Sequence, residues 1–227
     1  MIDFQERDRT RGRDSETDDE TTNEDDHAND DHNDSDPAHN ENGADHEHDE
    51  SDTDHDHHAH DDHDHHAHDI ESLGVAVLTI SSTRTLEDDA SGDAIVAALE
   101  AEGHEIVTRE IIRDDFDNVQ GGVDAVVGRG DVDAVVTTGG TGVTPDDVTV
   151  EAVEPLFEKE LPGFGELFRR LSYDEIGTRV VGTRATAGIA DGVPVFCLPG
   201  SENAARLGTE SIVVEQASHL AGLAKSE

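Results

Sequence analysis

The chain of 227 residues contains one cysteine, two lysines and no hydrophobic run long enough to span a membrane. A single cysteine, Cys197, excludes an internal disulfide and is typical of a protein from a reducing interior. Cys197 lies in the apolar segment 195–198, which favours a buried strand residue over a nucleophile. Because the first residues also lack an apolar signal segment, we expect a cytoplasmic protein with no membrane partner.

Positive charge is scarce, with 15 lysines and arginines against 56 aspartates and glutamates and a formal net charge of −41. Binding to a phosphate backbone requires a basic face, so we expect no nucleic-acid partner. A large negative charge keeps a protein soluble but makes it repel itself, which suits a cytoplasm rich in screening salt. The composition therefore predicts a halophilic source.

Charge and composition divide the chain into two parts. Residues 1–69 contain 27 acidic residues against four arginines, which gives −23, together with 13 of the 15 histidines. With so few apolar side chains this Asp/Glu/His-rich tail cannot offset chain entropy, so we expect it to be disordered. Residues 70–227 carry the remaining −18 and are long enough for one domain with a core.

The tail contains a tandem repeat. Residues 54–61 read Asp-His-Asp-His-His-Ala-His-Asp, and residues 62–69 repeat them letter for letter. Clustered imidazoles and carboxylates can bind transition metals such as Zn²⁺ or Ni²⁺. The interpretation we favour is a solvated acidic tail with incidental metal affinity, because composition alone specifies no binding geometry.

From residue 73 onward, apolar segments typical of buried strands alternate with segments of helical periodicity. We expect strands at 73–80, 105–112, 134–138 and 193–198, and helices at 91–102, 116–128, 148–157, 164–171 and 203–223. This alternation predicts an α/β domain of three layers, a parallel sheet with helices on both faces. Ligands of such sheets bind beyond the carboxyl ends of the strands, where the loops 81–87, 114–115, 139–147 and 199–203 should gather.

The most informative segment is 137–149, Thr-Thr-Gly-Gly-Thr-Gly-Val-Thr-Pro-Asp-Asp-Val-Thr. A glycine-rich loop between a strand and a helix start exposes backbone N–H groups, which favour an anion and most often phosphate. The segment has neither the Gly-Lys-Ser/Thr ending of a Walker loop nor the spacing of a dinucleotide fold. The following Asp146 and Asp147 suggest a divalent cation beside the phosphate. A plain strand–helix turn capped by one aspartate is the alternative at this point.

Several motifs occur in a fixed order along the domain. They are Thr137–Gly142, Pro162–Glu166, Leu171–Thr178, Arg184–Gly188 and Leu198–Ser201. In this order they resemble the MoaB/Mog family, which contains molybdenum-cofactor biosynthesis proteins, among them molybdopterin adenylyltransferases, and is similar to the G domain of gephyrin. The resemblance covers about residues 72–224 and does not include the tail.

The resemblance implies a molybdopterin-binding-like domain that assembles into homotrimers or homohexamers. It implies Mg²⁺-dependent transfer of the AMP part of ATP to molybdopterin, with release of pyrophosphate and use of the product by a downstream molybdenum-insertion protein. By motif matching, Asp147 resembles the catalytic, Mg²⁺-associated aspartate and Asp114 the second catalytic aspartate. The residues implied for the nucleotide and pterin pocket are Thr138, Gly139, Gly140, Thr141, Gly142, Pro199, Gly200, Ser201 and Asn203.

The loop after the first strand departs from the family pattern. Many relatives have Ser-Asp-x-Arg there, whereas this chain has Ser81-Ser82-Thr83-Arg84. Ser82 in place of the aspartate weakens the assignment of this loop to ligand contact. Two other functions stay open. One is a non-catalytic molybdopterin-binding or scaffold protein, because a fold does not guarantee an activity. The other is a metal-handling protein that acts through the His/Asp tail.

The charge of −18 on residues 70–227 predicts that stability rises with salt. The screening length falls from about 30 Å at 0.01 M salt to about 3 Å at 1 M, which relieves repulsion between surface carboxylates. We expect the Tm to increase steadily as KCl is raised over that range. A Tm that stays flat or falls would contradict a halophilic origin.

Overall fold

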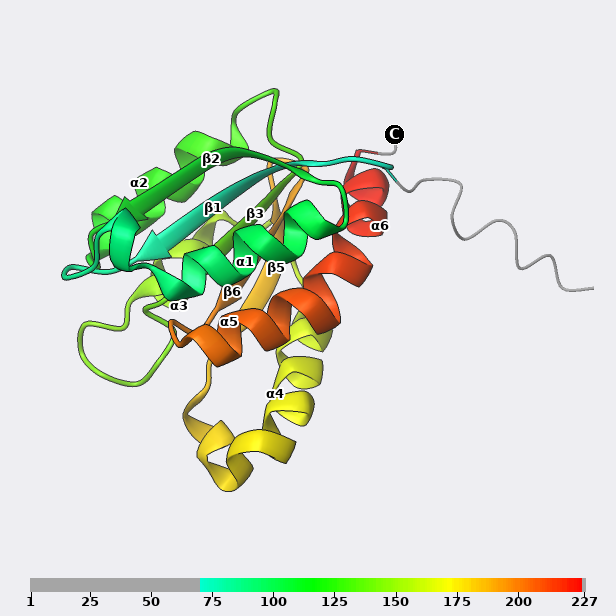
Figure 1. The fold of residues 1–227 in the computed structure, drawn as a ribbon. Helices are drawn as coiled ribbons and strands as arrows, with labels where there is room; N and C mark the ends of the chain where they lie inside the picture. Colours follow the sequence, from blue (N-terminus) through cyan, green and yellow to red (C-terminus); the bar gives the residue numbers. More distant parts are fainter. Residues whose placement is uncertain (1–69, 226–227) are drawn as a thin grey trace, which may run out of the picture. The chain divides into compact units, whose positions relative to one another are not determined.

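The computed structural model describes residues 70–225 (Figure 1). Six strands form a single sheet in the order β2-β1-β3-β6-β5-β4. The disorder predicted for residues 1–69 lies outside the described residues. The strands are β1 (Gly74–Ile80), β2 (Glu105–Ile112), β3 (Ala134–Thr138), β4 (Lys159–Glu160), β5 (Thr186–Ala190) and β6 (Val193–Leu198).

Six α-helices connect and cover these strands, and in the described part of the chain none is long and apolar enough to cross a membrane. The helices are α1 (Ala90–Ala101), α2 (Phe116–Val127), α3 (Thr149–Val153), α4 (Pro162–Ile176), α5 (Glu202–Gly208) and α6 (Val214–Ala224). Short helical turns lie between them at η1 (Leu86–Asp88), η2 (Glu154–Leu156), η3 (Gly177–Gly182) and η4 (Thr209–Val213).

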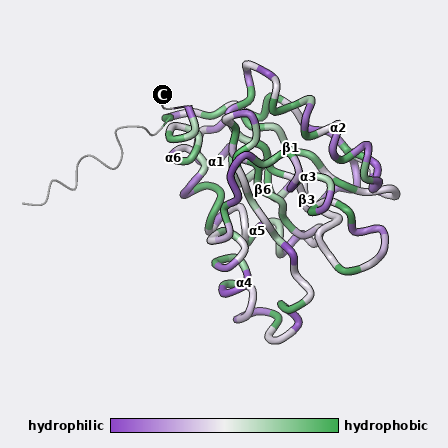
Figure 2. The backbone as a smooth tube through the Cα atoms, turned by 180° about the vertical axis from the view of Figure 1, so that it is seen from behind, coloured by the Kyte–Doolittle hydropathy of each residue, from purple (hydrophilic) through white to green (hydrophobic). Residues whose placement is uncertain are grey.

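The helices form the two outer layers of the predicted three-layer α/β fold. Along β1, Val75 and Val77 face α1, α4, α5 and α6, whereas Ala76 and Leu78 face α2 and α3. This alternation follows from the two-residue period of a strand and shows that both faces of the sheet are buried. Figure 2 shows the hydrophobic segments gathered at the central strands and hydrophilic segments recurring along the outer helix α2.

The sheet is mixed, which corrects the prediction of a parallel sheet. Strands β2, β1, β3 and β6 are parallel as expected, but β5 runs antiparallel to both β4 and β6. A hairpin joins β5 to β6, and its turn residues Asp191 and Gly192 have φ of 49° and 73°. An Asp-Gly pair with positive φ at both positions is a strong hairpin signal. We did not predict strand β5, because its residues are small and give no apolar run. Gly188 must be small, since an added Cβ would lie 2.3 Å from the Phe157 ring.

The C-terminal helix is interrupted, whereas we expected one helix over 203–223. Helix α5 passes through the π-helical turn η4 before α6 continues. The buried Thr209 hydroxyl donates to the Ala205 carbonyl at 2.8 Å, a back-bond that competes with the helical ladder. Gly208 lies against Leu198, where an added Cβ would be 2.3 Å from a methyl group. The interruption therefore fits the helix to the sheet at the end of β6.

One buried histidine provides a pH-dependent element of stability. His104 is 8% exposed, and its Nδ1 accepts a hydrogen bond of 3.4 Å from the Leu73 N–H. Burial lowers the pKa of His104 below its usual 6.5, with the Glu102 charge acting in the opposite direction. The folded state therefore binds a proton less readily than the unfolded state. The stabilisation is complete above the unfolded pKa, and it is lost as the pH falls from there through the lower pKa of the folded state.

We expect the His104→Gln variant to show a shallower loss of stability than the wild type on acidification. The measurement is the free energy of unfolding at pH about 7 and about 5.5, a window in which exposed carboxylates hardly titrate. Taking the difference between the two proteins in this pH-dependent change of unfolding free energy cancels the contributions of the other histidines. Parallel curves for the two chains would show that His104 carries no such linkage.

Candidate active site

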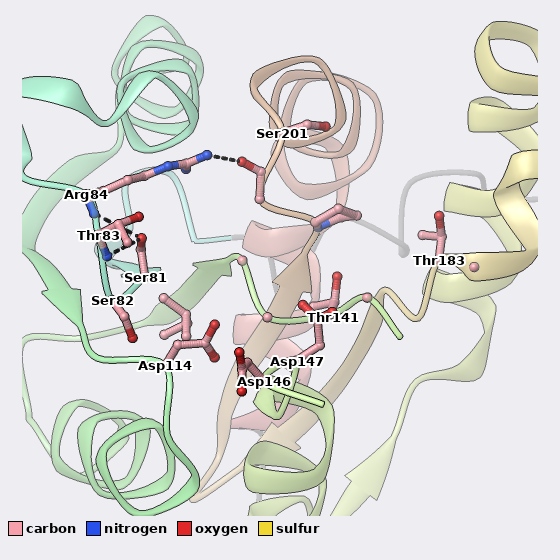
Figure 3. Close-up of a pocket in the computed structure, with 17 residues that line it drawn as sticks. Ser81, Ser82, Thr83, Arg84, Asp114, Thr141, Asp146, Asp147, Thr183 and Ser201 are labelled. Atoms are coloured by element: carbon pink, nitrogen blue, oxygen red, sulfur yellow. Dashed lines mark hydrogen bonds between the residues drawn. The ribbon is translucent and has the colours of Figure 1, made fainter. Parts of the chain in front are cut away.

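A cleft of about 900 Å³ opens at the carboxyl ends of β1, β2, β3 and β6 (Figure 3). This is the edge of the sheet at which the sequence places its loops, and it is where open α/β sheets bind ligands. All four expected loops reach it or its rim. The lining residues are Ile80, Ser81, Ser82, Thr83, Arg84, Asp114, Gly139, Gly140, Thr141, Gly142, Asp146, Asp147, Gly182, Thr183, Pro199, Gly200 and Ser201.

The glycines of the cleft allow three loops to pack directly on one another. Gly139 and Gly140 have φ of 105° and 64°, a region that other residues rarely adopt. An added Cβ on Gly139 would lie 2.3 Å from the Ile80 carbonyl oxygen, and one on Gly140 would lie 2.2 Å from Thr149 Oγ1. A Cβ on Gly200 would lie 3.0 Å from the Gly139 Cα. The loop therefore requires glycine at these positions for its own packing. From the sequence we had expected glycine to be required for close approach of the backbone to a ligand.

Two threonines fasten these loops from beneath. The Thr149 hydroxyl donates to the Gly139 carbonyl at 2.8 Å, and the Thr149 N–H donates to the Gly140 carbonyl at 2.9 Å. Thr138 is fully buried, and its hydroxyl donates to the Pro199 carbonyl at 2.9 Å. Thr138, which we expected in the pocket, therefore joins two loops and does not line the cleft.

Asn203 is the other expected pocket residue that does not line the cleft. It lies in a neighbouring cavity of about 410 Å³ that shares Thr183, Pro199 and Ser201 with the cleft. The Ser201 side chain accepts from the Ala204 N–H at 3.3 Å and so begins helix α5. The remaining expected residues, in the loops 139–142 and 199–201, do line the cleft.

Arg184 braces the glycine loop from outside, a function that the sequence did not reveal. Its Nε donates to the Gly142 carbonyl at 2.7 Å, and its Nη2 donates to the Asp147 carbonyl at 2.9 Å. The guanidinium also forms a two-point ion pair with the Glu151 carboxylate. Arg184 therefore anchors the backbone of the loop at two points, Gly142 and Asp147. The only sequence signal was the position of Arg184 within a family motif.

Asp147 is held in one orientation by its own turn. Its Oδ2 accepts hydrogen bonds from the Thr144 N–H at 2.8 Å and the Thr144 hydroxyl at 2.6 Å. Burial favours a higher pKa for Asp147, but these hydrogen bonds and the Arg184 charge outweigh it and lower the pKa below its ordinary value. Asp147 therefore presents a fixed, ionised carboxylate to the cleft.

Asp114 has the opposite environment. Its Oδ1 is buried without a hydrogen-bond partner, and Figure 3 shows its carboxyl group facing Asp146 and Asp147. Burial raises the pKa of Asp114, and the charges of Asp147, Asp146 and Asp115 raise it further. An unpaired carboxylate among other carboxylates is a feature of a cation site or a catalytic site.

These carboxylates fit Mg²⁺ better than a cation held by protein alone. Within residues 70–225 no group of three or more His, Cys, Asp or Glu side chains is arranged to hold a metal. Mg²⁺ commonly uses one or two carboxylates and completes its shell with water and substrate phosphates. Asp114 and Asp147, close to a glycine loop that can face a phosphate, satisfy that requirement.

Residues 76–219 match a family model described as a probable molybdopterin binding domain. The chain belongs to the MoaB/Mog family. This MoaB/Mog chain is 46% identical to molybdenum cofactor biosynthesis protein B of Bacillus subtilis over 145 residues, 63% of this chain and 85% of that protein. The corresponding Escherichia coli K12 protein is 41% identical over 142 residues, 63% of this chain and 84% of that protein.

Solved structures agree with this assignment. A crystal structure of molybdenum cofactor biosynthesis protein B superposes with a TM-score of 0.66 at 40% identity, covering 68% of this chain and 98% of that one. The tungsten cofactor synthesizing protein MoaB from Pyrococcus furiosus superposes with a TM-score of 0.62 at 39% identity, covering 69% and 99%. The family and the α/β fold are confirmed, and the chain is a cofactor biosynthesis protein of the MoaB type.

The loop packing predicts opposite effects for two glycine substitutions. Gly140→Ala forces a Cβ against Thr149 and a strained φ, so we expect a loss of stability of about 1–3 kcal/mol. Gly121→Ala is the matched control, because Gly121 lies inside α2 and its Cβ would meet nothing within 4 Å. Alanine there should stabilise the protein by about 0.4–1 kcal/mol. Equal changes in the free energy of unfolding would contradict the packing described for the loop.

Proposed function

We propose that this protein is a Mg²⁺-dependent molybdopterin adenylyltransferase, which joins the AMP part of ATP to the phosphate of molybdopterin and releases pyrophosphate. The observation that carries the proposal is the unpartnered Asp114 carboxylate facing Asp147, beside the glycine loop of a MoaB-type cofactor-biosynthesis chain. The cleft of about 900 Å³ lies near the upper end of the range for small-molecule sites, which gives room for two substrates.

The reaction places few chemical demands on the protein. An oxygen of the molybdopterin phosphate attacks the α-phosphorus of ATP, the bond to the bridging oxygen of the β-phosphate breaks, and pyrophosphate leaves with that electron pair. The attacking oxygen is already ionised near neutral pH, so no general base is required. Cys197 is unsuited to covalent catalysis, because it is fully buried and burial raises the pKa of its thiol to about 12. Catalysis then consists of positioning and charge neutralisation.

Each part of the cleft has a task in this scheme. Asp114 and Asp147 would hold Mg²⁺, which when bound supplies positive charge to the phosphate oxygens. Thr144 and Arg184 fix Asp147, one through its carboxylate and the other through its carbonyl. The loop 139–142 presents backbone groups to a phosphate, and Thr149 keeps the loop rigid.

The wider biological setting belongs to the same proposal. The protein would assemble as a homotrimer or homohexamer in a salt-rich cytoplasm and pass its product to a molybdenum-insertion protein. A related structure is titled a tungsten cofactor synthesizing protein, so tungsten is the alternative metal for the finished cofactor. The His-rich repeat at 54–69 lies outside the described residues, and a metal-handling task for it stays a separate hypothesis.

The proposal is tested by adenylyl transfer from MgATP to molybdopterin in high salt. We expect Asp147→Asn and Asp114→Asn each to lower turnover by about two orders of magnitude or more, as for removal of a main electrostatic element. Asp114→Asn should also keep or raise the Tm, because it removes a carboxylate whose raised pKa reflects burial and repulsion. Loss of activity with undiminished stability separates a functional carboxylate from a structural one.

Asp124→Asn serves as the control, because this substitution removes the same charge at a residue that lies on α2 and does not line the cleft. It should turn over like the wild type. Wild-type turnover in both cleft variants would refute the tasks given to Asp114 and Asp147. Binding of molybdopterin without any turnover by the wild type would instead favour a non-catalytic binding protein.

A further inference from the structure

The two ends of the cleft differ in charge. Asp114, Asp146 and Asp147 line one end, and Arg84 is the one cationic side chain among the described residues that line the cleft. Figure 3 shows Arg84 extending from the loop after β1 toward the backbone before Ser201, away from the carboxylates. The loop that we could not assign from sequence therefore brings a guanidinium into the site.

Arg84 is held by a chain of hydrogen bonds whose direction is fixed. Its Nη1 donates to Ser91 Oγ at 2.6 Å, and Ser91 Oγ lies 3.1 Å from Asp89 Oδ1. An ionised carboxylate can only accept, so the single Ser91 hydrogen points at Asp89 and its lone pairs face Arg84. The second anchor is the Gly200 carbonyl, which accepts from Arg84 Nη2 at 2.8 Å.

Asp89 is an ionised group in the interior. Its side chain is fully buried and lies 3.7 Å from Arg84 Nη1. Burial favours a higher pKa for Asp89, but hydrogen bonds from Thr79, Gly92 and Arg109, together with that from Ser91, lower the pKa below its ordinary value. A buried carboxylate with this many hydrogen-bond partners is held in one position, and it therefore fixes the orientation of the Ser91 hydroxyl.

Arg84 differs from Arg184 in the groups that its donors contact. Arg184 donates hydrogen bonds to two carbonyls and to the Glu151 carboxylate. The Glu151 carboxylate also neutralises the charge of the Arg184 guanidinium. Within the described residues Arg84 donates to one hydroxyl and one carbonyl, and its side chain is 35% exposed. Its Nη1 also lies 3.7 Å from the Asp89 carboxylate, but Arg109 shares that carboxylate at 3.2 Å. A guanidinium has five N–H groups in a planar fork suited to phosphate, so several remain available on the cleft side.

We propose that Arg84 binds a substrate phosphate at the end of the cleft opposite the three carboxylates, and that Asp89 acts through Ser91 as its positioning residue. The inference rests on the proposed function only for the identity of that phosphate, which belongs either to ATP or to molybdopterin. The cleft then takes two phosphate groups by different means, one through a cation at Asp114 and Asp147 and one directly through arginine.

The test is calorimetric binding of inorganic pyrophosphate in high salt, which does not depend on turnover. Arg84→Gln should weaken binding about tenfold to a hundredfold, the range for loss of a charged hydrogen bond. Ser91→Ala should weaken it less, and Ser91→Thr, which keeps the hydroxyl, should recover most of the loss. Asp93→Asn is the control, because Asp93 contacts Arg109 as Asp89 does but does not touch Arg84. Melting curves establish that each variant is folded.

Parallel titrations with MgATP and with molybdopterin identify which substrate supplies the phosphate that Arg84 contacts. It is the ligand whose Kd rises in Arg84→Gln. An unchanged pyrophosphate Kd in folded Arg84→Gln, or no pyrophosphate binding by the wild type, would overturn the anion site. A loss in Ser91→Ala that Ser91→Thr does not recover would overturn the positioning chain. Failure of the transferase proposal looks different, because the wild type would then bind these anions without turnover.

Discussion

The cleft depends on the close contact of three loops that meet with no side chain between them. The loop after β3 touches the Ile80 carbonyl on one side and the loop after β6 on the other. An added Cβ would clash at the first contact and would be tight at the second. Thr149 and Thr138 then tie these loops together through their hydroxyls. Residues from four strands consequently reach one site although 116 positions separate Arg84 from Gly200. Such preorganisation suits a reaction in which the protein contributes mainly placement.

The charge of the molecule sets the second constraint. A chain with a net charge of −41 repels anionic substrates, and Asp114, Asp146 and Asp147 increase that repulsion at one end of the cleft. A divalent cation and the Arg84 guanidinium provide the local positive charge that phosphate binding requires. High salt would weaken long-range repulsion while leaving contacts inside the cleft comparatively unscreened. The acidic surface and a phosphate-binding site are therefore compatible.

Most of the fold could be predicted because the hydrophobic pattern is strong. The strands over 105–112, 134–138 and 193–198 have the bounds we predicted, and β1 begins one residue later than expected. Strand β5 was missed, although Asp191-Gly192 signals its turn, because its residues are small where Phe157 and α4 pack. The break at Thr209 was missed because a hydroxyl back-bond leaves the apolar period unchanged. Local periodicity does not record these tertiary contacts.

The site was predictable only in part, for the same reason. Glycines, aspartates and the segment 199–201 stand out in the sequence, and the structure brings them to one cleft. Asp89 did not stand out, and Arg184 did so only as part of a family motif. The contacts of Arg184 are with residues as distant as Gly142, 42 positions before it. The family resemblance assigned Thr138 and Asn203 to the pocket, yet Thr138 is buried beneath the cleft and Asn203 lies in a neighbouring cavity.

The central claim is that acidic residues at one end of this cleft bind nucleotide through a divalent cation. The most direct measurement is the Kd of ATP in high salt with excess Mg²⁺ and again with the divalent cations removed by a chelator. Binding should be at least about tenfold tighter with Mg²⁺, a difference of about 1.4 kcal/mol. The same difference should disappear in Asp114→Asn combined with Asp147→Asn. Equal ATP affinity with and without Mg²⁺ in the wild type would contradict the claim.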